Sequence, residues 1–412
     1  MKNDYEVTII GAGPAGIMAA IAASQKGKKV VLLERNNRAG KKLLLTGKGR
    51  CNLTTAKPIP QIVEAFGKNG KFLYSAFTKF SNQDLISFFE SQGVKTKVEK
   101  GQRVFPQSDK AQDILDCLLD KLKKYKVKMI NNFRVEKIIR KPIGFTIKSV
   151  NDQSLKASNI ILATGGKSYP QTGSTGDGYH LAKNLGHQIS PLKPALAGLI
   201  VKDNHLKDLT GLSLKNVRIN FKTKNKILYS SFGEMLFTHQ GISGPIVLPS
   251  SKIIYEALNE REKVKAILDL KPALTKSQLK KRIFREIHQM PKKEFQNLLK
   301  ELLPKSLVNF ACQAIGIGPK SVNADLASLE VSQLVEFLKG FSFPISSVAP
   351  ISTAIVTSGG IKISQIDSKN MQSKLVPGLF FAGEVIELDG PTGGYNLQKA
   401  FSTGWLAGNS IS

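Results

Sequence analysis

The beginning of the chain carries the hydrophobic pattern of a strand, a turn and a helix. Residues 6–10 form a short apolar run that suits a buried parallel strand. Residues 11–16, with the sequence GAGPAG, follow at once, and an alanine-rich segment then predicts a helix to about Gln25. Residues 29–33 predict a second strand, which ends at the acidic residue Glu34. The pattern therefore predicts a βαβ unit.

Two later apolar runs also end in glycine. The run 159–163 continues into Thr164-Gly165-Gly166, and the run 378–382 continues into Gly383-Glu384. Each run predicts a strand with glycines just beyond its carboxyl end, which is where open α/β sheets bind their ligands. We therefore expect both segments to contribute to a ligand site.

The middle of the chain has a different pattern. Short alternating runs, such as Val217–Phe221 and Ile227–Phe232, predict antiparallel strands. Between residues 250 and 340, Leu, Ile and Phe recur at helical spacing among many lysines, and we expect helices to stop at Pro291 and Pro304. This part therefore predicts a β subdomain followed by a helical subdomain.

The predicted fold class is α/β, with a Rossmann-like dinucleotide-binding domain that carries this insertion. Residues 1–191 would form the first part of the Rossmann-like domain and residues 346–412 its second part. Residues 192–345 would form the inserted β plus helical domain, which we expect to face the substrate.

The charge of the chain favours a polyanionic partner. Its 412 residues include 60 Lys and Arg against 31 Asp and Glu, which gives a formal net charge of +29 at pH 7. A field of this size favours RNA, DNA or acidic lipid. The simpler alternative is a lysine-rich, solvated surface without a specific partner.

The cysteines and histidines exclude several kinds of site. Cys51, Cys117 and Cys312 form no CxxC pair, which argues against a disulfide scaffold, a zinc ribbon and a dithiol redox centre. The five histidines show no HExxH spacing, so we predict no metal site. The apolar stretch Val7–Ala23 contains the glycines of the first turn, which excludes a signal sequence or a membrane span there. We therefore predict a cytoplasmic protein that binds no membrane.

The first turn has the glycines that a dinucleotide requires. Gly11 permits the tight turn, Gly13 lets the backbone approach a pyrophosphate, and Gly16 allows the helix to pack closely on the strand. The N–H groups at the start of the helix would face the phosphates. Glu34 would accept hydrogen bonds from ribose hydroxyls and would repel a 2′-phosphate, which disfavours NADP at this site.

The last part of the chain favours FAD over NAD. Residues 376–384 resemble the second flavin motif of FAD-dependent reductases, in which an acidic residue after a strand holds the ribityl chain. Here that residue is Glu384, where many such proteins carry Asp. Residues 390–396 then open a predicted helix over residues 397–406, whose N–H groups would face the pyrimidine end of an isoalloxazine ring.

Several long motifs together resemble one family. Besides the GAGPAG turn they are TGKGRCN at 46–52, RVFP at 103–106, ATGGKSYPQTGSTGDG at 163–178, FTHQGISGP at 237–245 and GEVIELDGPTGGYN at 383–396. Over essentially its whole length the chain resembles the YhiN/HI0933-like family of bacterial flavoproteins, which includes BaiN-like and aminoacetone-oxidase-like members. The resemblance implies an FAD-binding Rossmann-like domain with inserted β and helical subdomains, and an FAD-dependent oxidoreductase activity.

The motifs and the resemblance together predict the FAD contacts. A cation at Lys42 or Lys48 beside the diphosphate makes electrostatic sense, and Val135 matches the backbone segment that brackets adenine in such folds. The predicted contacts are Gly11, Gly13, Pro14, Ala15, Gly16, Glu34, Arg35, Lys42, Gly47, Arg50, Cys51, Asn52, Val135, Ala163, Thr164, Gly165, Gly383, Glu384, Gly393, Gly394, Tyr395 and Asn396. No His or Cys is recognisably placed for covalent attachment, so we expect non-covalent FAD.

A hydride transfer to a polarised double bond also needs a proton donor. Cys51 has two basic neighbours in its loop, which would favour a reactive thiolate, although a small buried residue is the alternative. His239 lies in the predicted β subdomain, where it would either face the flavin or stabilise a turn. Tyr395 and Tyr169 are phenolic alternatives.

We expect reduction of an activated C=C bond, with uridine to dihydrouridine in ribosomal RNA as the main hypothesis. The charge suggests RNA, and members of the resembled family have been linked to dihydrouridine formation in ribosomal RNA. The alternatives are a small-molecule flavoenzyme, either an aminoacetone-type amine oxidase or an enoyl reductase, and an RNA-binding flavoprotein without turnover. The glycine pattern at 316–321 follows no predicted strand, so an NAD(P)H donor would dock only transiently.

The segment Lys271–Lys293 of the helical subdomain is a candidate RNA contact, and the alternative is that it forms a solvated helix face without a partner. Its acidic residue Glu286 stands among eight basic ones. These are Lys271, Lys276, Lys280, Lys281, Arg282, Arg285, Lys292 and Lys293.

Overall fold

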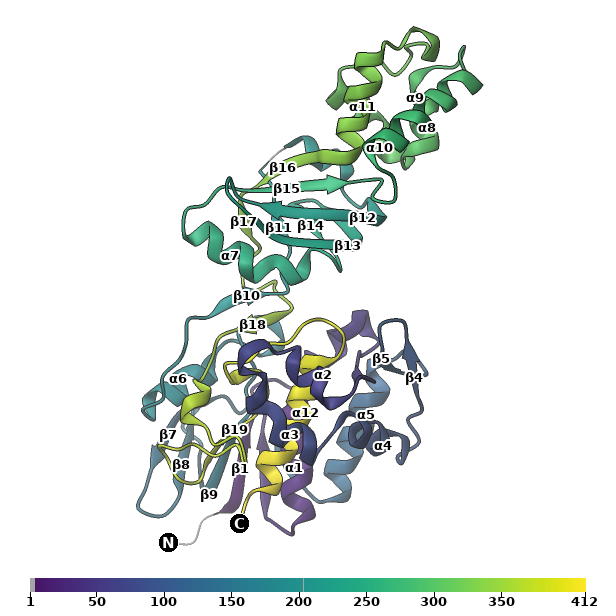
Figure 1. The fold of residues 1–412 in the computed structure, drawn as a ribbon. Coiled ribbons are helices and arrows are strands. Elements are labelled where there is room, and N and C mark those ends of the chain that lie inside the picture. The colour runs from purple at the N-terminus through teal and green to yellow at the C-terminus, as the bar shows by residue number, and fades with distance from the viewer. Residues whose placement is uncertain (1–3, 203) are drawn as a thin grey trace. The chain divides into compact units, whose positions relative to one another are not determined.

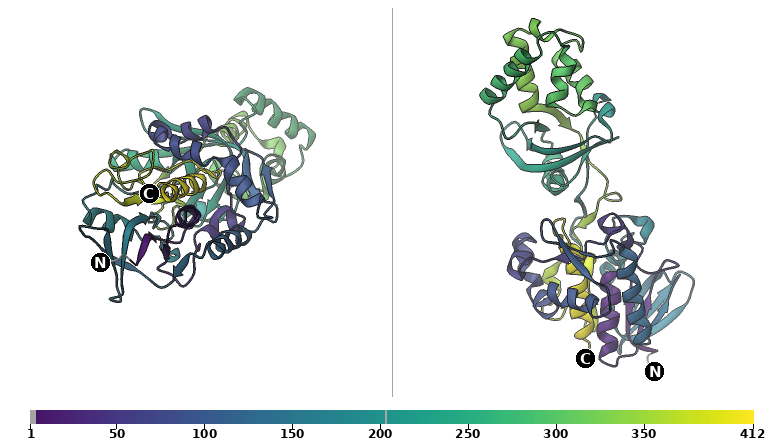
Figure 2. Two further views of the ribbon diagram at one scale, coloured as in Figure 1. Left: turned by 90° about the horizontal axis from the view of Figure 1, so that it is seen from below. Right: turned by 90° about the vertical axis from the view of Figure 1, so that its right-hand side faces the viewer.

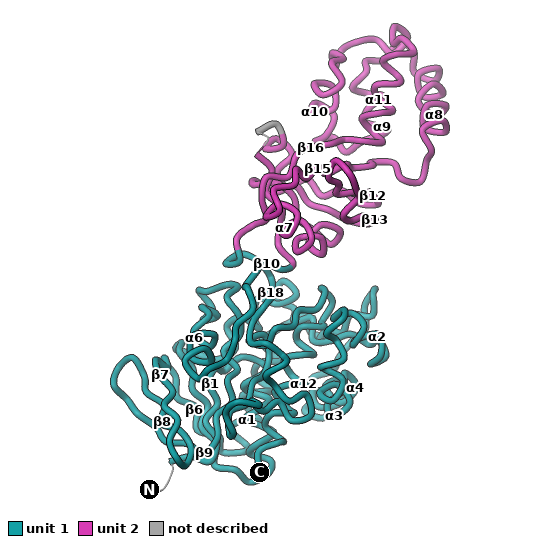
Figure 3. The backbone as a smooth tube through the Cα atoms, turned by 60° about the vertical axis from the view of Figure 1, so that its left-hand side comes forward, with its two compact units in different colours: residues 1–195, 351–412 teal, residues 196–350 magenta. Residues whose placement is uncertain are grey.

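The computed structural model describes residues 4–202 and 204–412, and it divides into two compact units (Figure 1 and Figure 3). Unit 1 comprises Met1–Ala195 and Ile351–Ser412, and unit 2 comprises Leu196–Pro350. The predicted insertion, 192–345, begins and ends a few residues earlier than unit 2. Each unit has its own hydrophobic core.

The centre of unit 1 is a seven-stranded sheet with the order β6-β2-β1-β9-β8-β7, in which β19 also pairs with β9. Its parallel strands are β1 (Tyr5–Ile10), β2 (Val30–Leu33), β6 (Lys128–Ile130), β9 (Ser154–Leu162) and β19 (Leu379–Phe381). Antiparallel strands β7 (Val135–Arg140) and β8 (Phe145–Ser149) complete the sheet. The predicted α/β, Rossmann-like class is confirmed, because parallel strands joined through helices define it.

The first and last helices of unit 1 lie side by side (Figure 2). They are α1 (Pro14–Gln25) and α12 (Tyr395–Asn409), and α1 is almost entirely buried. A Cβ atom at Gly404 would clash with the carbonyl oxygen of Ala15, and one at Gly408 would clash with that of Ala19. The two backbones therefore approach each other more closely than larger side chains would allow.

The remaining elements of unit 1 surround this sheet. Its other helices are α2 (Ile59–Glu64), α3 (Tyr74–Lys79), α4 (Asn82–Glu90), α5 (Ala111–Lys124) and α6 (Asp177–Asn184). A small antiparallel sheet contains β3 (Thr54–Thr55), β4 (Thr96–Glu99) and β5 (Arg103–Pro106). Strands β10 (Lys193–Ala195) and β18 (Val356–Ser358) pair near the points where the chain leaves and re-enters unit 1.

Unit 2 combines an antiparallel sheet with helices. The sheet has the order β16-β15-β12-β13-β14-β11-β17. Its strands are β11 (Leu199–Ile200), β12 (Ser213–Lys222), β13 (Ile227–Thr238), β14 (Gly241–Ser243), β15 (Val264–Asp269), β16 (Phe341–Ile345) and β17 (Ser347–Val348). The alternating runs Val217–Phe221 and Ile227–Phe232 lie on β12 and β13, which pair antiparallel as expected.

The helices of unit 2 follow the proline and glycine signals. They are α7 (Ser251–Asn259), α8 (Lys276–Gln289), α9 (Phe295–Leu302), α10 (Lys305–Ile315) and α11 (Ser328–Gly340). Helix α8 ends before Pro291, and Pro304 precedes α10. The glycine pattern at 316–321 follows α10 and not a strand, with Gly316 in the left-handed conformation that ends the helix.

The described residues bear on three expectations from the sequence, which concern a membrane span, cysteine pairs and a metal site. Among them, no helix combines the length and apolar character needed to cross a bilayer, and Val7–Ala23 falls on β1 and α1. The three cysteines are buried and free. Within residues 4–202 and 204–412, no group of His, Cys, Asp or Glu is arranged to hold a metal ion.

Candidate functional site

The carboxyl ends of four parallel strands meet at one edge of the unit 1 sheet. Ile10 of β1 lies beside both Leu33 of β2 and Leu162 of β9, and Phe381 of β19 also lies beside Leu162. The segments that follow these strands are therefore brought together, because parallel strands end at the same edge. These segments contain the GAGPAG turn, Glu34, Ala163-Thr164-Gly165 and Gly383-Glu384.

The GAGPAG turn leaves an open space above a helix start. Gly11 has φ +105°, and a Cβ atom there would lie 2.6 Å from the carbonyl oxygen of Ala163. A Cβ at Gly16 would clash with the carbonyl of Gly11, whereas one at Gly13 would meet no atom within 4 Å. Gly13 caps α1 without a side-chain hydrogen bond, and Pro14 and Ala15 are the first helical residues. The positive end of the helix dipole thus faces open space, where a phosphate fits.

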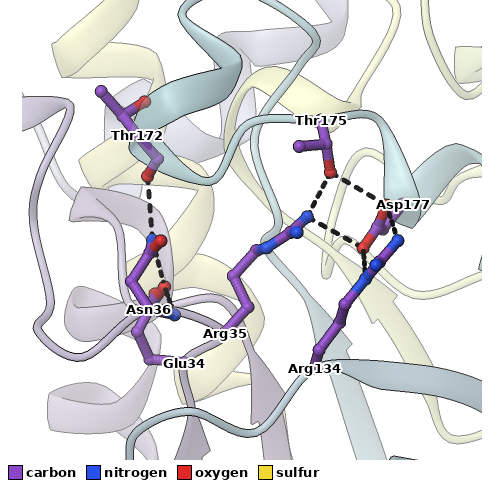
Figure 4. A network of polar contacts seen from close by, with 7 residues as sticks. All are labelled: Glu34, Arg35, Asn36, Arg134, Thr172, Thr175 and Asp177. Atoms are coloured by element: carbon purple, nitrogen blue, oxygen red, sulfur yellow. Dashed lines mark hydrogen bonds and ion pairs between the residues drawn. The ribbon is translucent and has the colours of Figure 1, made fainter. Parts of the chain in front are cut away.

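Glu34 is held in place at the end of β2. Its side chain is 7% exposed and accepts hydrogen bonds from the N–H of Ala12 (3.0 Å) and the N–H of Asn36 (2.8 Å). The Asn36 amide also donates to Glu34 (2.7 Å) and to the carbonyl of Thr172 (3.0 Å), as Figure 4 shows. The Phe133 N–H donates to the carbonyl of Glu34 (2.9 Å), which places the segment before Val135 next to this carboxylate.

Two arginines share one carboxylate beside Glu34 (Figure 4). Arg35 donates to Asp177 (3.0 Å) and to Thr175, and Arg134 donates to Asp177 (2.9 Å). Burial alone would raise the pKa of Asp177, but its hydrogen bonds and these two cations lower that pKa below its ordinary value. This network fixes Arg35 to the start of α6, a constraint that no local sequence signal shows.

Glu384 is a half-buried carboxylate with several partners. It accepts hydrogen bonds from Lys42 Nζ (2.8 Å), the N–H of Thr357 (2.8 Å) and the hydroxyl of Ser168 (3.4 Å). Burial would raise the pKa of Glu384, but Lys42 and the N–H of Thr357 outweigh burial and lower it. Lys42, a predicted diphosphate contact, is thus paired with the predicted ribityl contact.

Two buried hydroxyls near this edge have no hydrogen-bond partner among the described residues. They are Thr164 Oγ1, just after β9, and the phenol of Tyr179 in α6. Burial raises the pKa of Tyr179 well above its ordinary value, and the charge of Glu384 adds to this shift. Because buried polar groups are nearly always bonded, such atoms fit a site completed by a ligand. Tyr179 lies one residue beyond the 163–178 motif and was not predicted.

The TGKGRCN loop buries Cys51. Gly47, Lys48 and Cys51 all have φ near +60°, and the Cys51 N–H donates to the carbonyl of Thr46 (2.9 Å). The Cys51 side chain is 0% exposed, and burial raises the pKa of its thiol to about 12. The predicted reactive thiolate is therefore wrong, because desolvation of the thiol outweighs the hydrogen bond with Thr46 that would lower its pKa.

Arg50 does not support that thiolate. Its guanidinium pairs with Glu99 and with Asp109 (2.6 Å), and lies over the ring of Phe105 at 4.2 Å. These contacts bind the loop to β4 and β5. The Asn52 amide, oriented to satisfy both of its ends, accepts from the N–H of Gly394 (3.2 Å) and donates to the carbonyl of Thr54 (3.2 Å).

The loop before α12 closes the same region. Gly393 and Gly394 have φ +114° and +94°, and a Cβ at Gly394 would clash with the backbone of Thr54. The side chain of Asn396 bonds both backbone groups of Gly390, at 2.9 Å and 2.8 Å. Tyr395, the first residue of α12, is 6% exposed.

The next turn of α12 contains a buried lysine that the sequence analysis missed. Lys399 is 1% exposed, and its ammonium group donates to the carbonyl of Leu388. Burial lowers the pKa of Lys399 to about 8, while the charges of Glu384 and Asp389 oppose that shift. A single charged residue in an otherwise uncharged helix is the local signal of this role.

The residues matched by a family profile cover nearly the whole chain. The profile of the HI0933-like protein Rossmann domain matches residues 5–410. The chain belongs to the HI0933-like family. The resemblance found in the sequence is thereby confirmed.

Curated relatives of this chain include two different kinds of enzyme, a bile acid reductase and ribosomal RNA dihydrouridine synthases. A 3-dehydro-bile acid delta(4,6)-reductase of Clostridium scindens is 32% identical, with 98% of each chain covered. A ribosomal RNA dihydrouridine synthase of Haemophilus influenzae is 32% identical, with 100% of each chain covered. The enzyme of that name from Escherichia coli is 29% identical over 99% of this chain and 98% of its own. The HI0933-like protein is accordingly an FAD-dependent oxidoreductase.

Solved structures share the fold at low sequence identity. A 3-ketosteroid delta1-dehydrogenase from Sterolibacterium denitrificans has a TM-score of 0.55 and 12% identity, with 100% and 99% of the two chains covered. An open flavocytochrome c3 fumarate reductase has a TM-score of 0.52 and 18% identity, with 99% and 78% covered. These likenesses support the Rossmann-like class.

The four candidate proton donors of the sequence analysis belong to different units of the chain. Cys51 and Tyr395 lie in unit 1, as does Tyr169, which is half-buried with φ +52°. His239 is exposed in the turn between β13 and β14 of unit 2. The sequence-based alternative of a turn residue thus describes the location of His239.

The burial of Cys51 gives a chemical prediction. Iodoacetamide at mildly alkaline pH should leave Cys51 unmodified in the native protein, because the thiol is inaccessible and almost fully protonated. After denaturation all three cysteines should react, which provides the positive control. Peptide mass spectrometry measures both states, and rapid native labelling of Cys51 would contradict its burial.

Proposed function

We propose that this protein reduces uridine to dihydrouridine in ribosomal RNA, with non-covalently bound FAD. Sequence identity does not distinguish an RNA substrate from a small-molecule substrate, because the relative named for each kind is 32% identical to this chain. The observation that favours RNA is the formal net charge of +29, which suits a large polyanion with many phosphates. Such a substrate places the protein in the cytoplasm, without a membrane partner.

The unit 1 site has the groups that FAD requires. The open turn at Gly13 and the start of α1 would hold the pyrophosphate, while Glu34 would bind the ribose. Val135, buried at the start of β7, would contact the adenine, and Glu384 the ribityl chain. The start of α12 at Gly394 would lie at the pyrimidine end of the ring.

Two more of the predicted FAD contacts lie just after strands that end at the same edge of the sheet. Gly165 and Gly383 have φ +77° and +80°, so the backbone turns sharply after β9 and β19 without a side chain in the way. The N–H of Gly383 donates to the hydroxyl of Thr403 in α12 (2.9 Å), which fixes the segment before Glu384. Arg35 and Arg50 are exceptions among the predicted contacts, because ion pairs with acidic residues already hold both guanidinium groups.

The reaction needs a hydride, a proton and access to the base. FAD, when bound at the unit 1 edge, would supply a hydride for C6 of uracil, whose C5=C6 bond is conjugated to a carbonyl. The chain must deliver a proton to C5, and its candidates are Tyr395 at the start of α12 and His239 in unit 2. Cys51 is disfavoured, since its thiol is fully buried and holds its proton tightly.

The reductant would be a nicotinamide that docks only transiently. Unit 1 holds one Rossmann-like sheet, and the sheet of unit 2 is antiparallel throughout its described strands. Unit 2 therefore lacks the parallel βαβ arrangement that binds a second dinucleotide in other reductases.

A specific observation supports a second candidate function. The bile acid reductase relative covers this chain as fully as the dihydrouridine synthases do, which favours a small-molecule enoyl reductase. An amine oxidase of the aminoacetone type belongs to the same alternative. A flavin-carrying RNA-binding protein without turnover is a third hypothesis, which any turnover with a natural substrate would exclude.

Helix α8 is the proposed contact for RNA in unit 2. Its buried face consists of Leu279, Ile283 and Ile287, and the basic residues occupy the rest of the helix. Lys281 and Arg285 are exposed, whereas Lys280, Arg282 and the preceding Lys271 are half-buried. The neighbouring acids Glu286 and Glu336 offset only part of the charge.

Charge reversal on α8 should weaken RNA binding. Changing Lys280, Lys281, Arg282 and Arg285 to Glu should lower RNA affinity and flatten its dependence on salt, because fewer phosphates are neutralised. FAD content and the circular dichroism spectrum should be retained. The matched control reverses the exposed Lys124, Lys126, Lys128 and Lys137 of unit 1, with the same change in net charge. An equal loss in both variants, or in neither, would contradict a specific role of α8.

Exchange of Glu34 should weaken FAD binding. Glu34→Arg replaces a charged acceptor with a bulky cation, so FAD affinity should fall roughly 10- to 100-fold, in line with the value of a hydrogen bond to a charged group. Glu34→Gln keeps the shape and one acceptor, and should lose less. FAD is released by acid precipitation and measured by its absorbance. Unchanged occupancy, flavin in the pellet, or release of FMN would contradict the proposed binding.

The substrate proposal is tested in the cell. Nucleoside mass spectrometry of ribosomal RNA from a strain that lacks this gene should show loss of dihydrouridine. Wild-type protein should restore the modification, and the Glu34→Arg variant should restore less. An undiminished dihydrouridine level at every site would overturn the RNA substrate and favour the small-molecule alternative.

A further inference from the structure

An open groove lies on unit 1, and its lining contains none of the residues predicted to contact FAD. It has a volume of about 730 Å³ and lies between α2, the 3-10 helix Gly67–Leu73 and α3. Most of its lining is apolar, with a few charged side chains. The lining residues are Pro60, Val63, Glu64, Gly67, Lys68, Lys71 and Tyr74.

The wall of the groove is closely packed from behind. A Cβ atom at Gly70 would clash with the carbonyl oxygen of Val63, so the 3-10 helix lies directly against α2. Phe66 is 6% exposed and packs on Phe77, with ring centroids 5.8 Å apart. The groove is therefore preformed, and a ligand would not have to order it.

The same segment packs against the start of α12. The ring of Phe66 meets the edge of Tyr395, with centroids 6.4 Å apart, and a Cβ at Gly390 would lie 2.8 Å from that ring. Further along, Ser402 donates to the carbonyl of Phe80, the residue after α3. The segment 59–80 thus packs with one face against the loop before α12 and the start of that helix, and its other face carries the groove.

The exposed groups of the groove suit a nucleotide. Tyr74 is 56% exposed, which is unusual for a large aromatic side chain, and offers a ring for stacking. Lys68 and Lys71 are exposed and form no ion pair with any residue that the structure describes, so both ammonium groups are available to phosphates. Glu64 is the only acid in the lining, and it could accept the N–H of a base edge.

We infer that this groove binds an unpaired nucleotide of the RNA substrate, with its base on Tyr74 and its flanking phosphates at Lys68 and Lys71. This inference rests on the proposed function and adds a second RNA contact, close to the start of α12. A base that leaves its stack to be reduced exposes neighbours that have lost a stacking partner. A preformed aromatic platform with two cations would compensate for that loss. A duplex would not occupy it, because its base faces are covered.

The test uses the full FAD-loaded protein and a short, labelled, uridine-containing single-stranded RNA, with the matched duplex as comparison. Tyr74→Ala should weaken single-strand binding about 5- to 100-fold, which corresponds to the loss of one stacked base, and Tyr74→Trp should retain it. Lys68→Gln with Lys71→Gln should reduce the salt dependence by about two phosphate contacts. The controls are Ile143→Ala and Lys137→Gln with Lys141→Gln, all exposed residues in or beside β7, which should behave as wild type.

Three results would overturn the inference, and they separate it from the proposed function. Variants that bind the single strand as wild type does would exclude the groove, even where the deletion strain has lost dihydrouridine. Equal effects of the Tyr74 exchange on duplex and single strand would exclude base stacking. A wild-type protein that binds neither RNA would exclude the groove, and an undiminished dihydrouridine level would then exclude the substrate proposal as well.

Discussion

The close packing of α12 on α1 is the contact on which the site depends. Gly404 and Gly408 let the last helix lie against the backbone of Ala15 and Ala19 in the first helix. Overpacking such an interface with added methyl groups costs about 1–3 kcal/mol or displaces the helix. Because α12 starts at Tyr395, this packing fixes the start of α12 relative to the start of α1. Two helix starts that are far apart in the sequence are thereby held in fixed positions beside the same edge of the sheet.

The charges at that edge follow from burial. Glu384 is half-buried, and Lys42 and the N–H of Thr357 pair with its carboxylate directly. Lys399 is buried one turn into α12 and held by the carbonyl of Leu388. Both of these charges therefore have a bonded partner. The neutral hydroxyls of Thr164 and Tyr179 have no hydrogen-bond partner among the described residues, which fits a place where a bound molecule would complete the bonding.

The choice of substrate depends on a different part of the molecule from the chemistry. The proposed reduction of a conjugated C=C bond would use the unit 1 edge with either a small molecule or a pyrimidine as the substrate. RNA requires in addition a surface that neutralises phosphates and receives exposed bases. The basic face of α8 in unit 2 and the groove around Tyr74 in unit 1 are the proposed surfaces of this kind.

The sequence by itself determined the strands that precede the glycine turns, the GAGPAG turn, the inserted unit and the positions of Glu34 and Glu384, since each rests on a local pattern of apolar residues and glycines. It predicted a reactive Cys51 from its basic neighbours, and only the fold showed that burial keeps this thiol protonated. The fold also paired Arg35 with Asp177 and Arg50 with Glu99 and Asp109. Lys399, Tyr179 and the Tyr74 groove came from the tertiary structure alone. Burial and charge pairing depend on residues far apart in the chain, and no local pattern encodes them.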